Sequence, residues 1–374
     1  MLQRVASRWL KFESLLVLGL ITMWRQILCW LFLSVPLFAG AQDFDLGKLA
    51  DGVYAAIRRE PPGLTFVANS VFIINDDDVV VVDTGVGPAT AQTLIKALKG
   101  LTPKPVRYVV NTHWHDDHMM GNQAWREAYP GVEFIGQANT AREMLSTGAS
   151  NRRQLLEGGP AFAQQIRDAL AKNFNLAGKP ITLEERASHA SDVLWAERYF
   201  AEAPGFKPVT PGMTVETEMT LVRGARRIDI RYLGRAHTGA DLIVHLPAEN
   251  ILISGDLIVW PVPLFGSTSF PIDYIVTLEK LLALKPATIV PGHGPVMKDD
   301  AYARQMLALL QSIDRQVRAA VARGATLEDT RKSIKLDDHR HIFAGDSALK
   351  ALLFNSYVVG PGVARAWQQI SGKL

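Results

Sequence analysis

Runs of apolar residues that end in polar clusters recur along the chain and predict buried β-strands. Residues 78–85 (DVVVVDTG) form a near-continuous apolar run that delivers Asp83 to its end, as expected of a strand buried on both faces. The segment VRYVV leads directly into NTHWHDDHMMGN, residues 111–122. Comparable runs, each expected to be a strand, are found at 63–74, 226–234, 241–247, 251–256 and in ATIVPGHG, which ends at Gly294.

Other regions have the apolar spacing of helices. Residues 88–99 (PATAQTLIKALK) predict a helix that begins near Pro88 and stops at Gly100. Residues 138–205 have a helical period and few strand signals, which predicts a helical insertion between two β-rich halves. Residues 298–374 are expected to be mainly helical. Strands and helices in both halves imply a sheet sandwich covered by helices.

The first 41 residues differ from the rest of the chain. Two apolar runs, 14–24 and 27–41, are separated by only two residues, and the second ends in the small residues AGA, which suit a signal peptidase. We interpret residues 1–41 as a cleaved signal peptide, with Met23 as the expected true start, and residues 42–374 as the mature domain. Such a leader predicts a periplasmic or secreted protein. The alternative is a membrane anchor, because the joined runs are long enough to span a bilayer.

Composition narrows the chemistry of the mature chain. With 40 basic and 37 acidic residues the net charge is +3, which gives no reason to expect a nucleic acid partner. A small-molecule substrate is expected, and a membrane partner only if the leader stays uncleaved. The single cysteine, Cys29, lies inside the leader, so the mature chain has no thiol for a disulfide, a nucleophile or a metal ligand. Every metal ligand must therefore be His, Asp or Glu.

The segment 111–122 concentrates three histidines and two aspartates into six residues. In an extended segment residues i and i+2 point the same way, so His113 and His115 are expected to share a face. Asp117 and His118 follow as the chain turns toward a helix, and they can point to a second position nearby. This pattern suits the start of two adjacent metal sites. Imidazole and carboxylate suit zinc best, although manganese and iron also accept them.

Four ligands do not complete two metal sites, and the later chain offers three more at the exits of apolar strands. These are His237, Asp256 and His293, each with glycine nearby to let the backbone turn sharply. Taken singly, each could be an ordinary loop or turn residue, and so could Asp83. The whole set in this order is what predicts a metal centre.

The motifs THWHDDH, GRAHTGAD, SGD and PGHG, in that order, resemble the metallo-β-lactamase superfamily. VVVVDTG also stands where that family carries a strand-end aspartate. The resemblance spans about residues 63–297 and implies an α/β fold, a four-layer αββα sandwich with the metals at one edge of its two sheets. The helical insertion 138–205 and the helical C-terminal extension 298–374 lie outside it.

The resemblance also implies roles for individual residues. Asp83 would orient a ligand through a hydrogen bond, and Asp116, the variable residue of the motif, is expected to face away. Asp117 is the expected catalytic group, which would orient a hydroxide shared by the two metals or pass on its proton. The implied ligands of two zinc ions per chain are His113, His115 and His237 for one ion, Asp117, His118 and His293 for the other, and Asp256 as the bridge.

The fold hosts many chemistries, so several functions stay open. The favoured one is an exported dinuclear zinc hydrolase of ester, thioester, lactone or amide-type bonds, because the seven ligands look more like the glyoxalase II, lactonase and phosphodiesterase branches. A β-lactamase is an alternative, although Asp256 stands where the best-known lactamase group has cysteine, and the stretch after it lacks that group's lysine. A mononuclear iron oxidoreductase similar to persulfide dioxygenases and a non-catalytic metal-binding protein are the others.

Two aromatic residues, Trp260 and Phe265, closely follow the predicted bridging aspartate. They are candidates for a wall of the substrate pocket, with packing over the metal site as the alternative. No feature of the sequence identifies the substrate or the oligomeric state. The remaining histidines are expected to be structural, His189 and His245, or to lie in a solvated loop, His339 and His341.

Overall fold

The computed structural model describes residues 43–64 and 67–374. The predicted signal peptide and its alternative, a membrane anchor, lie outside the described residues. Within the described residues, no helix combines the length and apolar character that crossing a bilayer requires.

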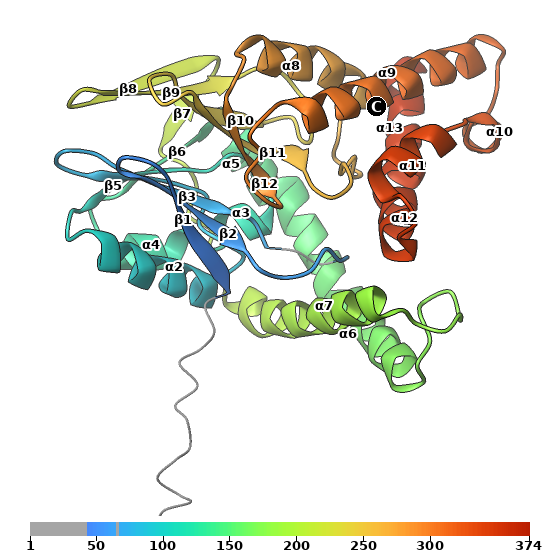
Figure 1. The fold of residues 1–374 in the computed structure, drawn as a ribbon, viewed down its shortest axis with the longest axis horizontal. Coiled ribbons are helices and arrows are strands. Elements are labelled where there is room, and N and C mark those ends of the chain that lie inside the picture. The colour runs from blue at the N-terminus through green and yellow to red at the C-terminus, as the bar shows by residue number, and fades with distance from the viewer. Residues whose placement is uncertain (1–42, 65–66) are drawn as a thin grey trace, which may run out of the picture. The chain divides into compact units, whose positions relative to one another are not determined.

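Two β-sheets form the centre of the described region (Figure 1). The first sheet follows the chain order, β1 to β7, antiparallel from β1 to β4 and parallel from β4 to β7. Its strands are β1 Phe44–Ala50, β2 Val53–Arg58, β3 Ser70–Ile74, β4 Val79–Val82, β5 Val106–Val110, β6 Glu133–Gln137 and β7 Met213–Val215. The second sheet has the order β12-β11-β10-β9-β8. Its strands are β8 Glu218–Arg223, β9 Arg226–Tyr232, β10 Leu242–Leu246, β11 Ile251–Val259 and β12 Thr288–His293.

Apolar layers lie between the sheets and on their outer faces. Successive strand residues point to opposite faces, so Val82 shares the cluster between the sheets with Val290, whereas Val81 packs toward the outer face with Leu94. This arrangement confirms the predicted αββα sandwich. The helices that contribute to the outer layers are α2 Pro88–Leu101 and α4 Asn122–Ala128 on the first sheet, and α8 Pro271–Ala283, α9 Ala301–Ala322 and α13 Gly360–Ile370 on the second.

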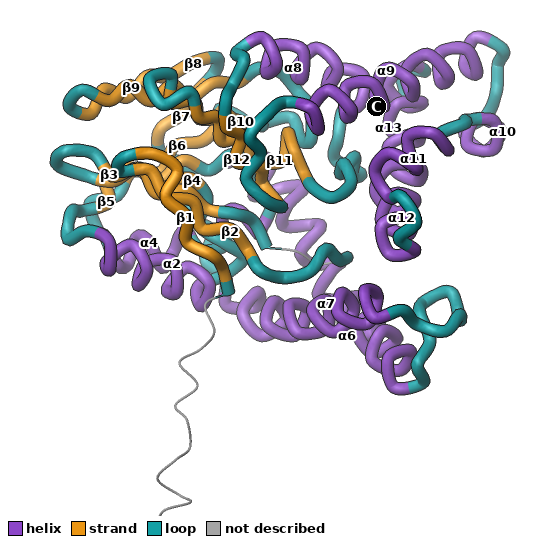
Figure 2. The backbone as a smooth tube through the Cα atoms, in the orientation of Figure 1, coloured by secondary structure: helices purple, strands orange, loops and turns teal. Residues whose placement is uncertain are grey.

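Between β6 and β7 the chain leaves the first sheet and forms a helical insertion. Its two long helices, α6 and α7, pack against each other, and Figure 2 shows them outside the sandwich. The start of α7 is fixed by a capping box, in which Thr182 accepts from the Glu185 amide and Glu185 accepts from the Thr182 amide. The elements of the insertion are α5 Thr140–Glu143, a π-helix Met144–Gly148, α6 Ala149–Ala171, α7 Leu183–Glu202 and a 3₁₀-helix Ala203–Gly205.

The chain after β12 is helical and reaches the insertion, where the Ser347 hydroxyl donates to Glu184 at 2.6 Å. His339 and His341 lie on a helix of this region, so the expected loop was wrong. Acidic residues in the first turn favour a helix there, and Phe343 is buried beneath it. After α9 the helices are α10 Leu327–Ser333, α11 Asp337–Ala344, α12 Ala348–Phe354, a π-helix Asn355–Val359 and α13.

The strand expected at 63–74 begins only at Ser70. The preceding Asn69 accepts from the Arg58 amide of β2 at 3.0 Å and also binds the end of β12. Its backbone amide donates to the Gly292 carbonyl at 2.8 Å, and its side chain donates to the carbonyls of Pro291 and Gly294. These bonds connect the first sheet to the end of β12, which carries His293.

Candidate metal centre

The residues of the histidine segment lie where strands end at one edge of the sheets. His113 and His115 occupy the loop after β5, and Asp117 and His118 lie in the short helix α3, Asp116–Met119. The other three candidates arrive from the second sheet. His237 lies in the loop after β9, Asp256 within β11, and His293 at the last position of β12.

The structure brings all seven predicted ligand residues together in two groups. The first contains His113, His115, His237 and Asp256, and the second contains Asp117, His118 and His293. Within each group, one nitrogen or carboxylate oxygen from every residue lies within 4.8 Å of the others. Four of the seven side chains come from the segment after β5 and three come from the second sheet, so the grouping depends on the closed sandwich.

Asp256 lies between the two groups and faces both. Its Oδ2 lies 3.3 Å from Nε2 of His237 and 3.9 Å from Nε2 of His113. Its Oδ1 lies 3.2 Å from Nε2 of His118 and 3.3 Å from Nε2 of His293. The backbone at Gly292 passes so close to Oδ1 that a Cβ there would collide with it. Glycine is therefore required at this position for the strands to bring the carboxylate and His293 together.

Hydrogen bonds from outside the two groups orient the imidazole rings. Nδ1 of His118 lies 2.7 Å from Oδ2 of Asp83, and Nδ1 of His237 lies 3.2 Å from the Leu264 carbonyl. Both rings thus present Nε2 to the centre, which fixes the tautomer that can bind a cation. Asp83 also accepts from the amide and hydroxyl of Thr112, each at 2.8 Å, which holds the loop that carries His113.

A buried amide network that the sequence analysis did not identify braces the same loop. The side chains of Asn111 and Asn122 exchange hydrogen bonds of 3.1 and 2.8 Å, and the Thr84 hydroxyl donates to Asn122 at 2.8 Å. The two asparagines bracket the motif as the first and last letters of NTHWHDDHMMGN. The asparagine at each end of the motif could have predicted this network, because two amide side chains can each donate to and accept from the other.

Burial and nearby charges shift the pKa values of these histidines in opposite directions. Burial and the neighbouring imidazoles hold the pKa of His113 well below its usual range and lower the pKa of His115 to about 3. Burial acts in the same direction at His293, but Asp256 and Asp117 outweigh it and raise the pKa of that ring to about 9. Likewise, against burial, the carboxylates of Asp117, Asp256 and Asp83 raise the pKa of His118.

The donor set fits two divalent cations. Five imidazoles and two carboxylates lie together, with His115 and Asp117 partly buried and the other five buried, and the carboxylates lie 3.2 to 3.9 Å from four of the ring nitrogens. Charged and polar groups this deeply buried are costly unless they are paired or coordinate a metal. Nitrogen and oxygen donors without a thiolate are compatible with zinc, manganese or iron.

Asp116 lies outside both groups, and its carboxylate binds the helical insertion. Arg152 of α6 donates from Nε to Oδ2 at 2.8 Å, and the Tyr199 hydroxyl of α7 donates to the same oxygen at 2.6 Å. The residue expected to face away therefore binds both long helices of the insertion. Sequence reasoning missed this role because its partners stand 36 and 83 positions away.

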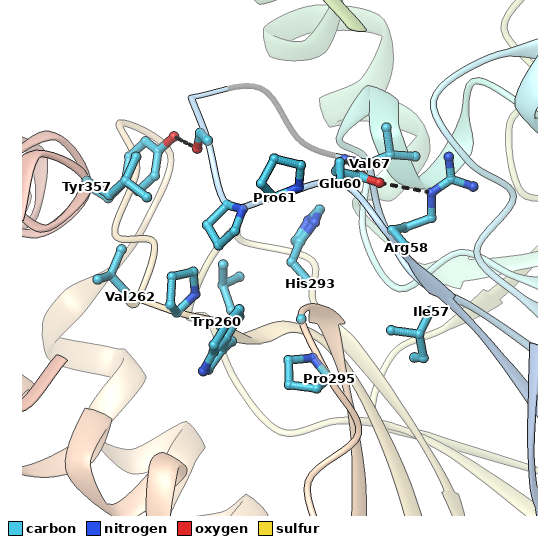
Figure 3. A pocket seen from close by; sticks show the side chains of 16 residues that line it. Ile57, Arg58, Glu60, Pro61, Val67, Trp260, Val262, His293, Pro295 and Tyr357 are labelled. Atoms are coloured by element: carbon cyan, nitrogen blue, oxygen red, sulfur yellow. Dashed lines mark hydrogen bonds and ion pairs between the residues drawn. The ribbon is translucent and has the colours of Figure 1, made fainter. Parts of the chain in front are cut away.

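The two aromatic candidates have different positions. Trp260 lines a cavity of about 240 Å³ beside His293, and Figure 3 shows His293 among Pro61, Trp260 and Pro295. Phe265 has no exposed surface, and its ring lies 5.7 Å from that of Tyr274 in the core. Phe265 therefore packs in the core of the second half and does not line this cavity.

Comparisons with known proteins agree with this geometry. A model of the metallo-beta-lactamase superfamily matches residues 64–293. The chain is 21% identical over 279 residues to a linear primary-alkylsulfatase of a Pseudomonas species, which is 70% of this chain and 49% of the relative. It is 42% identical over 67 residues to a hydroxyacylglutathione hydrolase of Gloeobacter violaceus, 17% of this chain and 25% of the relative. The chain thus spans about half or less of the length of these relatives.

A solved metallo-beta-lactamase from Pontibacter korlensis is also similar. It has 21% sequence identity and a TM-score of 0.49, and the match covers 72% of this chain and 99% of that chain.

Proposed function

The chain belongs to the metallo-β-lactamase superfamily, and from this premise we propose that it is an exported dinuclear zinc hydrolase. The favoured substrates contain an ester, thioester or lactone bond, or a related amide-type bond. The two relatives named above support hydrolysis of ester-type bonds, since one is named an alkylsulfatase and the other a hydroxyacylglutathione hydrolase. Export is proposed from the sequence of residues 1–41, with its apolar run and small-residue cleavage site.

The observation that carries the proposal is the position of Asp256 between two complete groups of donors. One carboxylate oxygen faces His113 and His237 and the other faces His118 and His293. Two cations bound by such a set supply a Lewis acid and a water of lowered pKa. A single-iron site, as in the oxidoreductase alternative, would leave one of these groups without a cation.

The residues of the centre would have separate roles in binding the cations and activating water. His113, His115 and His237 would hold one cation, Asp117, His118 and His293 the other, and Asp256 both. Oδ2 of Asp117 lies 3.3 Å from Nε2 of His118 and 3.2 Å from Nε2 of His293. The Asp117 carboxylate would orient the attacking water and take its proton.

Metal analysis and turnover together test the proposal. The purified protein should contain two zinc ions per chain and should hydrolyse at least one member of a panel of p-nitrophenyl esters, thioesters, lactones, alkyl sulfates and β-lactams. The same preparation should lose turnover on chelation and regain it with zinc. One iron per chain with no hydrolysis would favour the oxidoreductase, and two zinc ions without turnover of any compound would contradict catalysis. Sequencing the N-terminus of exported protein tests cleavage after Ala41.

A further inference from the structure

A second cavity, of about 300 Å³, lies between the ligand loop and the helical insertion. His115 and Asp117, each from one of the two donor groups, line it on the loop side. The opposite side is mainly hydrocarbon and aromatic. This side includes Leu155 of α6 and Trp195, Ala196 and Phe200 of α7.

The charged residues beside these ligands neutralise each other. Arg152 and Asp116 both line the cavity, but they form an ion pair that also includes the Tyr199 hydroxyl. The Arg152 guanidinium lies 4.2 Å from the centre of the Phe206 ring, which covers one of its faces. The pair leaves Arg152 little capacity to bind an anionic substrate group. A carboxylate or phosphate that reached the insertion side of this cavity, away from the metal ligands, would lose water without gaining a cationic partner there.

We propose that this cavity binds an uncharged, apolar acyl or alkyl group of the substrate while the bond to be cleaved lies at the metal centre. The inference rests on the proposed function and specifies its substrate class. The volume is at the lower end of the range of about 300–1,000 Å³ that small-molecule sites occupy, which suits a chain of medium length. Each methylene that enters should raise binding about fourfold, until the cavity is full.

Two substitutions alter the cavity without touching the ligand residues. Ala196→Leu adds three carbon atoms to a wall where the residue is 9% exposed. Leu155→Ala removes a wall residue that is 47% exposed, so folding should tolerate the change. Ala190→Leu is the matched control, because it makes the same exchange at an exposed position of the same helix.

Two measurements on the full chain test the inference. The first is the binding of 1-octanol by calorimetry, with and without zinc, which needs no catalysis. Ala196→Leu should weaken octanol binding at least tenfold and Leu155→Ala about threefold, whereas Ala190→Leu should leave it within twofold of the wild type. The second is kcat/KM along p-nitrophenyl acetate, butyrate, hexanoate and octanoate, which should rise with length in the wild type and flatten in Ala196→Leu.

The outcomes separate this inference from the proposed function. Octanol binding that responds to Ala196→Leu while no ester is hydrolysed would support the apolar site and contradict the hydrolase. Ester hydrolysis with equal kcat/KM for all lengths, or with octanol binding unaffected by both substitutions, would overturn the apolar site and leave the hydrolase standing. A preference for monosuccinate or monoglutarate esters over neutral esters of the same length would also overturn it.

Discussion

The ligand edge and the helical insertion lie side by side but are built in different ways. At the ligand edge, Asp83, Asp256 and the five histidines are held by short contacts within a few motifs, and His118 and His237 have no exposed surface. The insertion is exposed on much of its surface. Among the described residues, six of the ten large hydrophobic side chains with substantial exposure belong to it: Leu145, Leu155, Phe162, Phe174, Leu183 and Leu194.

This difference suggests that the ligand edge determines catalysis and the insertion determines substrate preference. The ligand edge has little freedom to change, because partners orient the rings of His118 and His237 and the backbone passes close to Asp256. The insertion contacts that edge through Asp116 and through the packing of Met144 with Trp114 and Met119, none of which is among the seven gathered residues. We therefore expect substitutions at the edge to alter metal content and turnover together, and substitutions in the insertion to alter substrate preference alone.

The largest expected effect comes from removing a ligand. His118→Ala should lower turnover by more than about 100-fold and should remove at least one zinc ion per chain. This loss exceeds the loss of about 10–100-fold that is typical of substituting a residue that only hydrogen-bonds to a ligand. The far-UV circular dichroism spectrum should stay that of the folded protein. Plasma emission spectrometry of the purified variant measures the metal, with His341→Ala on the exposed face of α11 as the control. Full metal content with full turnover would remove His118 from the site.

A smaller effect is expected one step outward, at Asp83. Asp83→Asn should weaken zinc binding by about 10–100-fold, because the amide cannot offer the charged acceptor that orients His118. The residue has a positive φ of 58°, and asparagine tolerates that backbone region better than most residues, so the exchange isolates the charge. Competition with a chelator measures the affinity. Asp77→Asn, in the exposed turn before β4, should leave it unchanged.

The junction between the two regions is the third test. Arg152→Met should lower kcat/KM for the longest neutral esters by about tenfold, equivalent to about 1.4 kcal/mol, because Asp116 loses a partner and α6 loses an anchor. Zinc content should stay at the wild-type level. The exposed neighbour Arg153 provides the control, as Arg153→Met. If Arg152→Met lost zinc in proportion to its loss of kcat/KM, the insertion would support the ligand edge. Substrate preference and metal binding would then not be separate.

The same contrast explains what the sequence could predict. The ligand residues follow strands or turns within short motifs, so Asp83 and the histidine segment could be assigned from local spacing. The bonds of Asp116 to Arg152 and Tyr199 depend on how two long helices return to the sandwich, which no local pattern specifies. Strands β1 and β2 were missed for a related reason. Their sequences, FDLGKLA and VYAAIR, contain few β-branched residues, so their pairing is set by the sheet.

The smallest effect is expected where the insertion meets the core, at Glu143 of α5. Burial raises the pKa of this carboxyl group, and the nearby Asp241 adds to the shift. A raised pKa in the folded state means that Glu143 contributes stability at acid pH, which is lost as the pH rises through that pKa. At pH 7.5, Glu143→Gln should therefore raise Tm by up to about 2 °C, because the group is only half-buried.

The difference in Tm between Glu143→Gln and the wild type should shrink toward pH 4.5, where the wild-type carboxyl group takes up its proton. Differential scanning fluorimetry at the two pH values measures it, with Glu157→Gln on the exposed face of α6 as the matched control. Zinc content should be the same in all three proteins, since Glu143 is outside both donor groups. A variant less stable than the wild type at pH 7.5 would mean that the ionised carboxylate stabilises the junction, and the insertion would then depend on charge at two points, Asp116 and Glu143.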